Sequence, residues 1–171
     1  TVFTPEMLEE INAQIDYLCG LRFTREELNY LRSIRFIKDD YVEFLRLWHP
    51  IREYVHTGLS DRGELILTVK GPMFSAMQFE IYLLEIVNEV YFRMHYDYAQ
   101  LEESARQRLE QKIKDFNSGK YTFRFAEFGC RRRLSRQWQD EVVRRLSTET
   151  KNCAGTSNVY LAWKYNLTPI G

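Results

Sequence analysis

Residues 121–171 read YTFRFAEFGCRRRLSRQWQDEVVRRLSTETKNCAGTSNVYLAWKYNLTPIG, and this stretch decides the fold. Its hydrophobic pattern alternates between strand-like and helix-like segments. We predict strands over 121–128, over 152–154 and from Thr168 onward, and helices over 134–148 and 157–165. Because strands that alternate with helices are typical of a parallel sheet with crossover connections, we expect the start of an α/β unit in residues 120–171.

The preceding residues, 1–119, have a different pattern. Short helices come first, followed by a β-hairpin, a long helix that is apolar around most of its circumference, and a charged amphipathic helix. The helices are predicted from Thr4 to Gly20, from Thr24 onward, and over 38–48, 73–98 and 101–116, and the hairpin strands over 54–59 and 64–70. Thr24 and Glu27 form a capping-box pattern, which marks a helix start. We therefore expect an α+β domain over residues 1–119.

The composition narrows the class of protein. The chain has 171 residues, 44% of them hydrophobic, and 24 basic and 24 acidic residues give a formal net charge of zero. The high apolar content and low net charge exclude a disordered chain, and the balanced charge argues against a nucleic-acid partner. No segment approaches the roughly 18 consecutive apolar residues that a membrane span requires. An odd number of cysteines, Cys19, Cys130 and Cys153, without a CxxC pair or a signal peptide, indicates a reducing compartment. We expect a cytoplasmic protein without a membrane partner.

Two polar segments follow the predicted strands, where the ligands of parallel α/β sheets bind. The first, Glu127 to Arg133, ends in three consecutive arginines. Guanidinium groups bind phosphate bidentately, and placing cations at the start of a helix is unfavourable unless an anionic ligand lies there. The alternative is that these arginines pair with Asp140 or Glu141, or with another subunit. The sequence leaves both interpretations open.

The second segment is Gly155-Thr156-Ser157-Asn158. Its small polar residues precede a predicted helix, for which Ser157 is a suitable N-cap. Free backbone N–H groups and hydroxyls at such a position also bind carboxylate or phosphate. A helix cap and an anion site are compatible, so the segment carries both predictions.

These two segments resemble the signatures of the nicotinate phosphoribosyltransferase family. Glu127 to Ser135, EFGCRRRLS, resembles its phenylalanine-glycine-x-arginine-arginine motif, and 155–162, GTSNVYLA, resembles its second signature, which 164–171 continues. The motifs are in order and correctly spaced over residues 123–171, while the upstream residues match more loosely. The resemblance implies a fragment that lacks the extreme N-terminus and the C-terminal half of the enzyme.

The family resemblance implies a fold, a reaction and partners. The fold would be that of a type II phosphoribosyltransferase, an N-terminal α+β domain followed by an α/β barrel. The enzyme would convert nicotinate and phosphoribosyl pyrophosphate into nicotinate mononucleotide and pyrophosphate in NAD biosynthesis, with coupled ATP hydrolysis, Mg²⁺, and a homodimer whose active sites form at the interface. The resemblance places the ATP and Mg²⁺ ligands outside this segment, so we expect the segment alone to be inactive.

The resemblance also assigns roles to individual residues. Phe128 would stack on the pyridine ring, and Arg131, the candidate catalytic residue, would contact the ring substrate or the phosphoribosyl phosphates. Thr156 and Ser157 would lie near the pyridine substituent. Three neighbours, Gly129, Arg132 and Arg133, would have supporting or inter-subunit roles.

Ser157 bears on the choice of substrate. Nicotinamide-using relatives have aspartate at this position, and an aspartate would repel the carboxylate of nicotinate, whereas a hydroxyl donates a hydrogen bond to it. Ser157 therefore favours nicotinate. The alternatives are a nicotinamide-using phosphoribosyltransferase, or a helical module that binds an acidic partner or RNA without catalysis.

Overall fold

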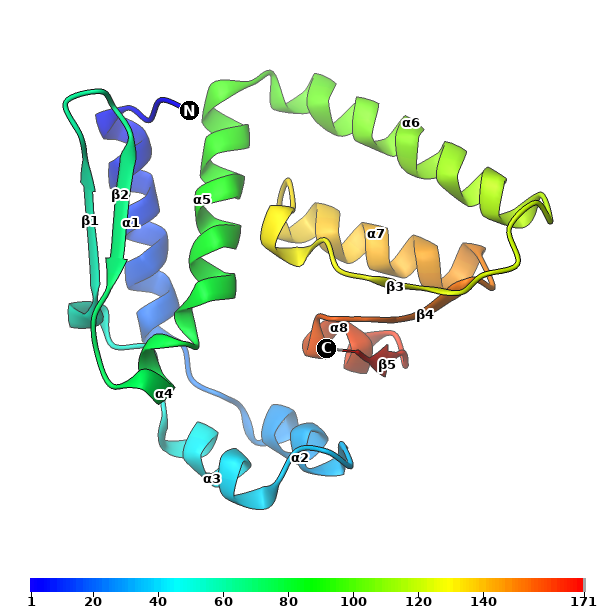
Figure 1. Ribbon diagram of the computed structural model, residues 1–171, viewed down its shortest axis with the longest axis horizontal. Helices are drawn as coiled ribbons and strands as arrows, with labels where there is room; N and C mark the ends of the chain where they lie inside the picture. Colours follow the sequence, from blue (N-terminus) through cyan, green and yellow to red (C-terminus); the bar gives the residue numbers. More distant parts are fainter. Residues whose placement is uncertain (171) are drawn as a thin grey trace. The chain divides into compact units, whose positions relative to one another are not determined.

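The computed structural model describes residues 1–170, which form two compact units, one over Thr1–Val90 and the other from Tyr91 onward (Figure 1). The first unit consists of helices and one β-hairpin. Its elements are α1 (Pro5–Gly20), α2 (Arg25–Ser33), α3 (Asp39–Leu47), η1 (Arg52–Tyr54), β1 (Val55–Leu59), β2 (Leu65–Val69), α4 (Met73–Ala76) and most of α5 (Phe79–His95). The predicted helix starts and the hairpin are thus confirmed.

Capping residues explain where the first helices begin. The Thr4 hydroxyl accepts a hydrogen bond from the Met7 N–H, and Pro5 occupies the first helical position, which tolerates a missing N–H. The capping box of α2 is complete, because Thr24 accepts from the Glu27 N–H and Glu27 accepts from the Thr24 N–H. Both helix starts are therefore encoded locally.

The hairpin is fixed to α1 by polar contacts. Asn12 on α1 accepts hydrogen bonds from the Thr57 hydroxyl and from Arg52, and Arg52 also pairs with Asp16 at 2.6 Å. At the turn, Gly63 has a φ of +73° and its carbonyl accepts from the Phe3 N–H. The hairpin therefore has a defined placement on α1.

The predicted single helix over 73–98 is wrong in two respects: it is divided, and α5 ends at His95 rather than at residue 98. The structure divides it at Met77 and Gln78 into α4 and α5, and the Gln78 side chain donates to the Tyr41 hydroxyl at 3.1 Å. Hydrophobic periodicity does not detect such a break, because apolar residues continue on both sides of it. Among the helices of residues 1–170, none has the length and apolar character to cross a membrane.

The second unit contains a three-stranded parallel sheet with flanking helices. Its elements are α6 (Tyr98–Asn117), β3 (Phe125–Glu127), η2 (Cys130–Arg132), α7 (Arg136–Glu149), β4 (Cys153–Thr156), α8 (Val159–Lys164) and β5 (Thr168–Pro169). The strand order is β3-β4-β5, and both neighbouring pairs are parallel. The predicted alternation of strands and helices is confirmed.

Strand β3 is shorter than the predicted 121–128. The Asn152 side-chain amide donates to the carbonyls of Tyr121 and Phe123, at 3.3 and 2.7 Å. These carbonyls are satisfied by a side chain instead of a neighbouring strand, so ladder pairing begins only at Phe125, opposite Cys153.

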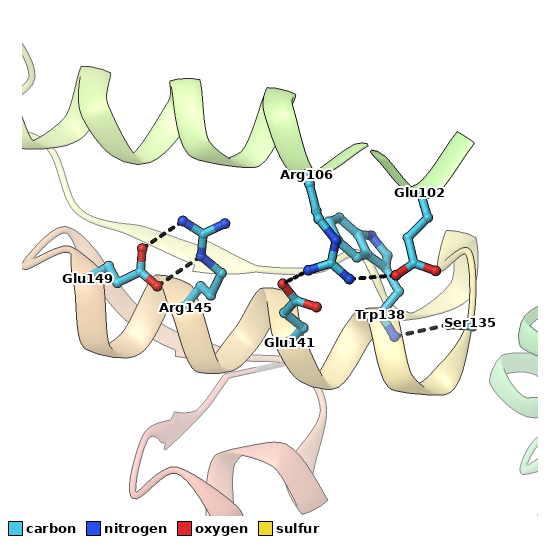
Figure 2. A network of polar contacts seen from close by, with 7 residues as sticks. All are labelled: Glu102, Arg106, Ser135, Trp138, Glu141, Arg145 and Glu149. Atoms are coloured by element: carbon cyan, nitrogen blue, oxygen red, sulfur yellow. Dashed lines mark hydrogen bonds and ion pairs between the residues drawn. The ribbon is translucent and has the colours of Figure 1, made fainter. Parts of the chain in front are cut away.

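Helices α6 and α7 pack against each other through an apolar cluster with a polar border. The cluster consists of Leu109, Ile113, Trp138 and Leu146. Figure 2 shows Arg106 of α6 bonded to Glu102 and Glu141, and its guanidinium lies 5.6 Å from the Trp138 ring centroid. This packing places α6 in the second compact unit, whereas the predicted domain boundary near Gly119 separates α6 from α7.

Asp140 links α7 to the end of α8. It accepts hydrogen bonds from Lys164 at 2.7 Å and from the Tyr165 hydroxyl at 2.9 Å. Burial acts to raise the pKa of the Asp140 carboxyl, but these two bonds outweigh it, and the pKa lies below its ordinary value of 3.8. The carboxylate therefore contributes stability above that value, and the contribution is lost as the pH falls below it.

We expect Asp140→Asn to lower the free energy of unfolding at neutral pH and to flatten its decline in acid. Urea unfolding of the 171-residue chain at a series of pH values measures this difference. The exposed turn residue Asp61 provides a matched control, Asp61→Asn, which should follow the unaltered chain. A difference for Asp140→Asn that stays constant through pH 3.8 would contradict the assignment.

Candidate functional site

The candidate site lies where β3 and β4 end. Phe128 follows β3 directly and leads into the turn η2, and Ser157 follows β4 directly. Because neighbouring parallel strands have their carboxyl ends at the same edge of the sheet, the two following loops lie next to each other. This is the edge that the sequence pattern predicts.

The residues predicted to contact substrate are accessible, with the exception of Thr156, which is buried. Phe128 is 58% exposed, Arg131 and Arg132 are exposed, and Ser157 and Arg133 are partly buried. Phe128 and Arg131 are exposed and Ser157 is only partly buried, so these side chains are open to a ligand rather than sealed in the interior. The geometry is therefore compatible with the predicted pyridine site.

Hydrogen bonds hold the two loops together. The Ser157 N–H donates to the Glu127 carbonyl at 2.9 Å, which places residue 157 one peptide away from Phe128. The Asn158 side-chain amide donates to the Cys130 sulfur at 3.1 Å, next to Arg131. The structure thus brings the backbones that carry Phe128, Arg131 and Ser157 to one place.

Glu127 is a buried residue of this site that the sequence motifs do not single out. It is 7% exposed, its Oε1 accepts from the Gly129 N–H, and its Oε2 accepts from the Thr156 hydroxyl at 2.8 Å. The sequence does contain one signal for Glu127: an acidic residue in a strand whose other residues, Phe125 and Ala126, are apolar. A buried carboxylate needs hydrogen-bond donors, and it finds them on both loops.

Thr156 lies deeper than its neighbours. Its side chain is fully buried, and its hydroxyl donates to Glu127 and accepts from the Asn158 N–H at 3.2 Å. These bonds give Thr156 a role in shaping the loop around Ser157. A direct contact between Thr156 and substrate stays a prediction.

The predicted helix starts near the site need two corrections. The N-cap of α8 is Asn158 rather than Ser157, because the Asn158 side chain accepts from the Leu161 N–H at 2.9 Å. Ser157 is therefore not used as a cap. The arginines precede α7 by several residues, since its N-cap is Ser135, so the argument from the helix dipole does not apply to them.

The carboxylates proposed as partners of the arginine cluster are bonded to other residues. Glu141 pairs with Arg106 of α6, and Asp140 pairs with Lys164. Structural pairing of residues 131–133, with these acids or with another subunit, stays an open alternative to anion binding.

A metal site is a separate question from the pyridine site. Within residues 1–170, no group of three or more His, Cys, Asp or Glu side chains is arranged to hold a metal ion. That the Mg²⁺ and ATP ligands lie outside this segment stays a prediction.

Comparison with known proteins gives matches over nearly the whole chain. Residues 2–88 match the model of the nicotinate phosphoribosyltransferase N-terminal domain, and residues 123–171 match that of the nicotinate phosphoribosyltransferase family. The nicotinate phosphoribosyltransferase of Neisseria gonorrhoeae is 44% identical over 97% of this chain and 43% of its own length. That of Acinetobacter baylyi is 43% identical over 97% of this chain and 42% of its own length.

Solved structures agree with the sequence matches. The nicotinate phosphoribosyltransferase of Porphyromonas gingivalis matches with a TM-score of 0.84 and 28% identity, over 100% of this chain and 44% of that one. The Vibrio cholerae enzyme also matches with a TM-score of 0.84, at 29% identity, over 97% of this chain and 41% of that one. This chain therefore spans less than half the length of these relatives. With both family models matched in order, the chain belongs to the nicotinate phosphoribosyltransferase family.

Proposed function

We propose that this chain supplies the pyridine-binding part of an enzyme that condenses nicotinate with phosphoribosyl pyrophosphate. The products are nicotinate mononucleotide and pyrophosphate, which places the enzyme in NAD biosynthesis. Beyond family membership, one observation carries the proposal: the exposed Phe128, the exposed Arg131 and the accessible Ser157 lie on two loops tied together by hydrogen bonds.

The aromatic ring and the hydroxyl would orient the pyridine. Phe128 offers a flat apolar face for stacking, which favours an aromatic substrate. The Ser157 hydroxyl would donate to the carboxylate of nicotinate, and the Ser157 N–H is already bonded to the Glu127 carbonyl. This arrangement would hold the ring nitrogen toward the sugar while the carboxylate faces the loop after β4.

The charge on Arg131 would serve the chemical step. The bond between the anomeric carbon and pyrophosphate breaks as the ring nitrogen attacks, so the ribose becomes cationic and the leaving group gains negative charge. A guanidinium is a strong bidentate donor to phosphate or carboxylate, and a preorganised cation lowers the barrier where charge develops. No nucleophilic side chain is needed, because the pyridine attacks directly.

Other properties of the enzyme follow from the family resemblance and stay expectations. They comprise the type II phosphoribosyltransferase barrel, a homodimer with shared active sites, Mg²⁺, and ATP hydrolysis through a phosphohistidine. A cytoplasmic location is supported by the three free thiols, Cys19, Cys130 and Cys153. Binding of nucleic acid or membrane is not expected from the neutral net charge.

The Ser157→Asp variant tests the substrate. In a full-length protein that carries this segment, we expect kcat/KM for nicotinate to fall about 10- to 100-fold, because a charge-assisted hydrogen bond worth roughly 1.5–3 kcal/mol is replaced by repulsion. The value of kcat/KM for nicotinamide should fall less than the value for nicotinate, or should rise. Steady-state kinetics with both pyridines, at saturating phosphoribosyl pyrophosphate, measure the change.

Ser104→Asp, which adds the same charge on the exposed face of α6, is the matched control and should leave both activities unchanged. An unaltered protein that prefers nicotinamide would overturn the assignment of nicotinate. Polynucleotide binding with a steep salt dependence and no competition by phosphoribosyl pyrophosphate would instead support the non-enzymatic alternative.

A further inference from the structure

We propose that Glu127 is a positioning residue that sets the affinity for the pyridine. It does so by fixing the loop after β3, residues 128–132 (the Phe128 loop), to the loop at the end of β4, residues 156–158 (the Ser157 loop). This inference rests on the proposed function and adds to it a residue whose contacts are with the two loops instead of with the substrate. Glu127 lies at the end of β3, between the two loops, and is 7% exposed.

The contacts of Glu127 reach both loops at once. Its Oε1 accepts from the Gly129 N–H in the Phe128 loop, and its Oε2 accepts from the Thr156 hydroxyl at 2.8 Å. Its backbone carbonyl accepts from the Ser157 N–H at 2.9 Å. One residue therefore anchors the segment before Arg131 and the segment that carries the Ser157 hydroxyl.

The chemistry of the side chain explains why an acid is used. Both donors point at carboxylate oxygens, and a carboxylate accepts at both of its oxygens, whereas a glutamine amide accepts at one and donates at the other. Burial of a carboxylate costs free energy that an apolar or amide side chain would avoid. A charged residue at this position is therefore suited to holding two donors from different loops.

The hydrogen bonds of Glu127 influence both sequence neighbours of Ser157, namely Thr156 and Asn158. The Thr156 hydroxyl that donates to Glu127 also accepts from the Asn158 N–H, and the Asn158 side chain contacts the Cys130 sulfur and caps α8. Ser157 thus lies between two residues whose conformations depend on the carboxylate. Turning or removing that carboxylate should disturb the placement of the Ser157 hydroxyl and of Phe128 together.

The first experiment uses kinetics of a full-length protein that carries this segment. In Glu127→Gln we expect KM for nicotinate to rise about tenfold, with kcat changed less than about threefold, because the loops lose their relative placement while the reacting groups remain. Thr156→Val should give a similar split, and Thr156→Ser, which keeps the hydroxyl, should restore the original KM. The double variant Glu127→Gln/Thr156→Val should raise KM no further than the more impaired of the two single variants does.

The second experiment needs no catalysis. Amide hydrogen exchange of the 171-residue chain should speed up in both loops, at residues 128–132 and 156–158, in Glu127→Gln. Glu141→Gln is the matched control, because Glu141 is a partly buried acid that bonds to Arg106 away from the site. It should leave exchange in both loops unchanged, and in the full-length protein it should leave KM unchanged.

The outcomes separate this inference from the proposed function. Reduced stability of Glu127→Gln with an unchanged KM, or faster exchange in one loop only, would overturn the positioning role. Absence of nicotinate mononucleotide synthesis by the unaltered full-length protein would overturn the proposed function. In that case the exchange data would still decide whether Glu127 couples the two loops.

Discussion

Replacing Arg131 with alanine is expected to lower kcat/KM for nicotinate mononucleotide synthesis by at least about 100-fold in a full-length protein that carries this segment. Two charge-assisted hydrogen bonds to a substrate anion would be lost, and each is worth roughly 1.5–3 kcal/mol. Arg131 is exposed in the turn η2, so its removal leaves no cavity in a packed core. Steady-state kinetics with nicotinate and phosphoribosyl pyrophosphate measure the loss.

Two further variants make the Arg131 result specific. Arg144→Ala removes an exposed arginine from α7 and should leave turnover unchanged. Arg131→Lys keeps the charge without the planar fork, so it should recover only part of the activity. Turnover of Arg131→Ala equal to that of the unaltered protein would show that Arg131 has a structural role and that the catalytic assignment is wrong.

Much of the fold is predictable because its signals are local. The capping residues Thr4 and Thr24 fix the starts of α1 and α2 through hydrogen bonds within one turn. The parallel sheet follows from the alternation of strand and helix patterns after residue 120. Such features depend on residues close in sequence, and the structure confirms them.

The differences from prediction come from contacts between residues distant in sequence. The Asn152 side chain satisfies carbonyls about 30 positions earlier and thereby shortens β3. The compact second unit includes α6 because Leu109 and Ile113 pack with Trp138 of α7. Neither contact has a signature in the periodicity of its own segment.

The candidate site shows the same division between local and distant information. The motif residues Phe128, Arg131 and Ser157 are recognisable from the sequence, and their placement at one edge of the sheet follows from the parallel order. The pairing of Glu127 with Thr156 is not recognisable, because nothing in either motif indicates which hydroxyl reaches the carboxylate. The motifs therefore indicate candidate substrate contacts, which stay predictions, but they do not indicate the hydrogen bonds that hold the two loops together.

Gly155→Ala is expected to destabilise the second unit by about 3 kcal/mol or more, the upper end of the range for overpacked positions. Gly155 pairs with Thr168 in the parallel ladder, and a Cβ at residue 155 would clash with the Thr168 carbonyl oxygen and come within 2.8 Å of Ile170 Cδ1. A backbone oxygen cannot move aside without breaking the pairing of β4 with β5. For a chain of this size, that loss corresponds to a decrease in Tm of roughly 6–12 °C.

Thermal unfolding of the 171-residue chain, followed by tryptophan fluorescence, measures the effect of Gly155→Ala; Trp138 and Trp163 report the second unit, and Trp48 reports the first. Gly58→Ala is the matched control, because Gly58 is also a strand glycine and a Cβ added there would meet nothing within 4 Å. A Tm for Gly155→Ala equal to that of Gly58→Ala would contradict the close approach of β4 and β5. Because Thr156 and Ser157 follow Gly155 directly, loss of this pairing would also displace the loop that carries the Ser157 hydroxyl, so the glycine is required for the site as well as for the sheet.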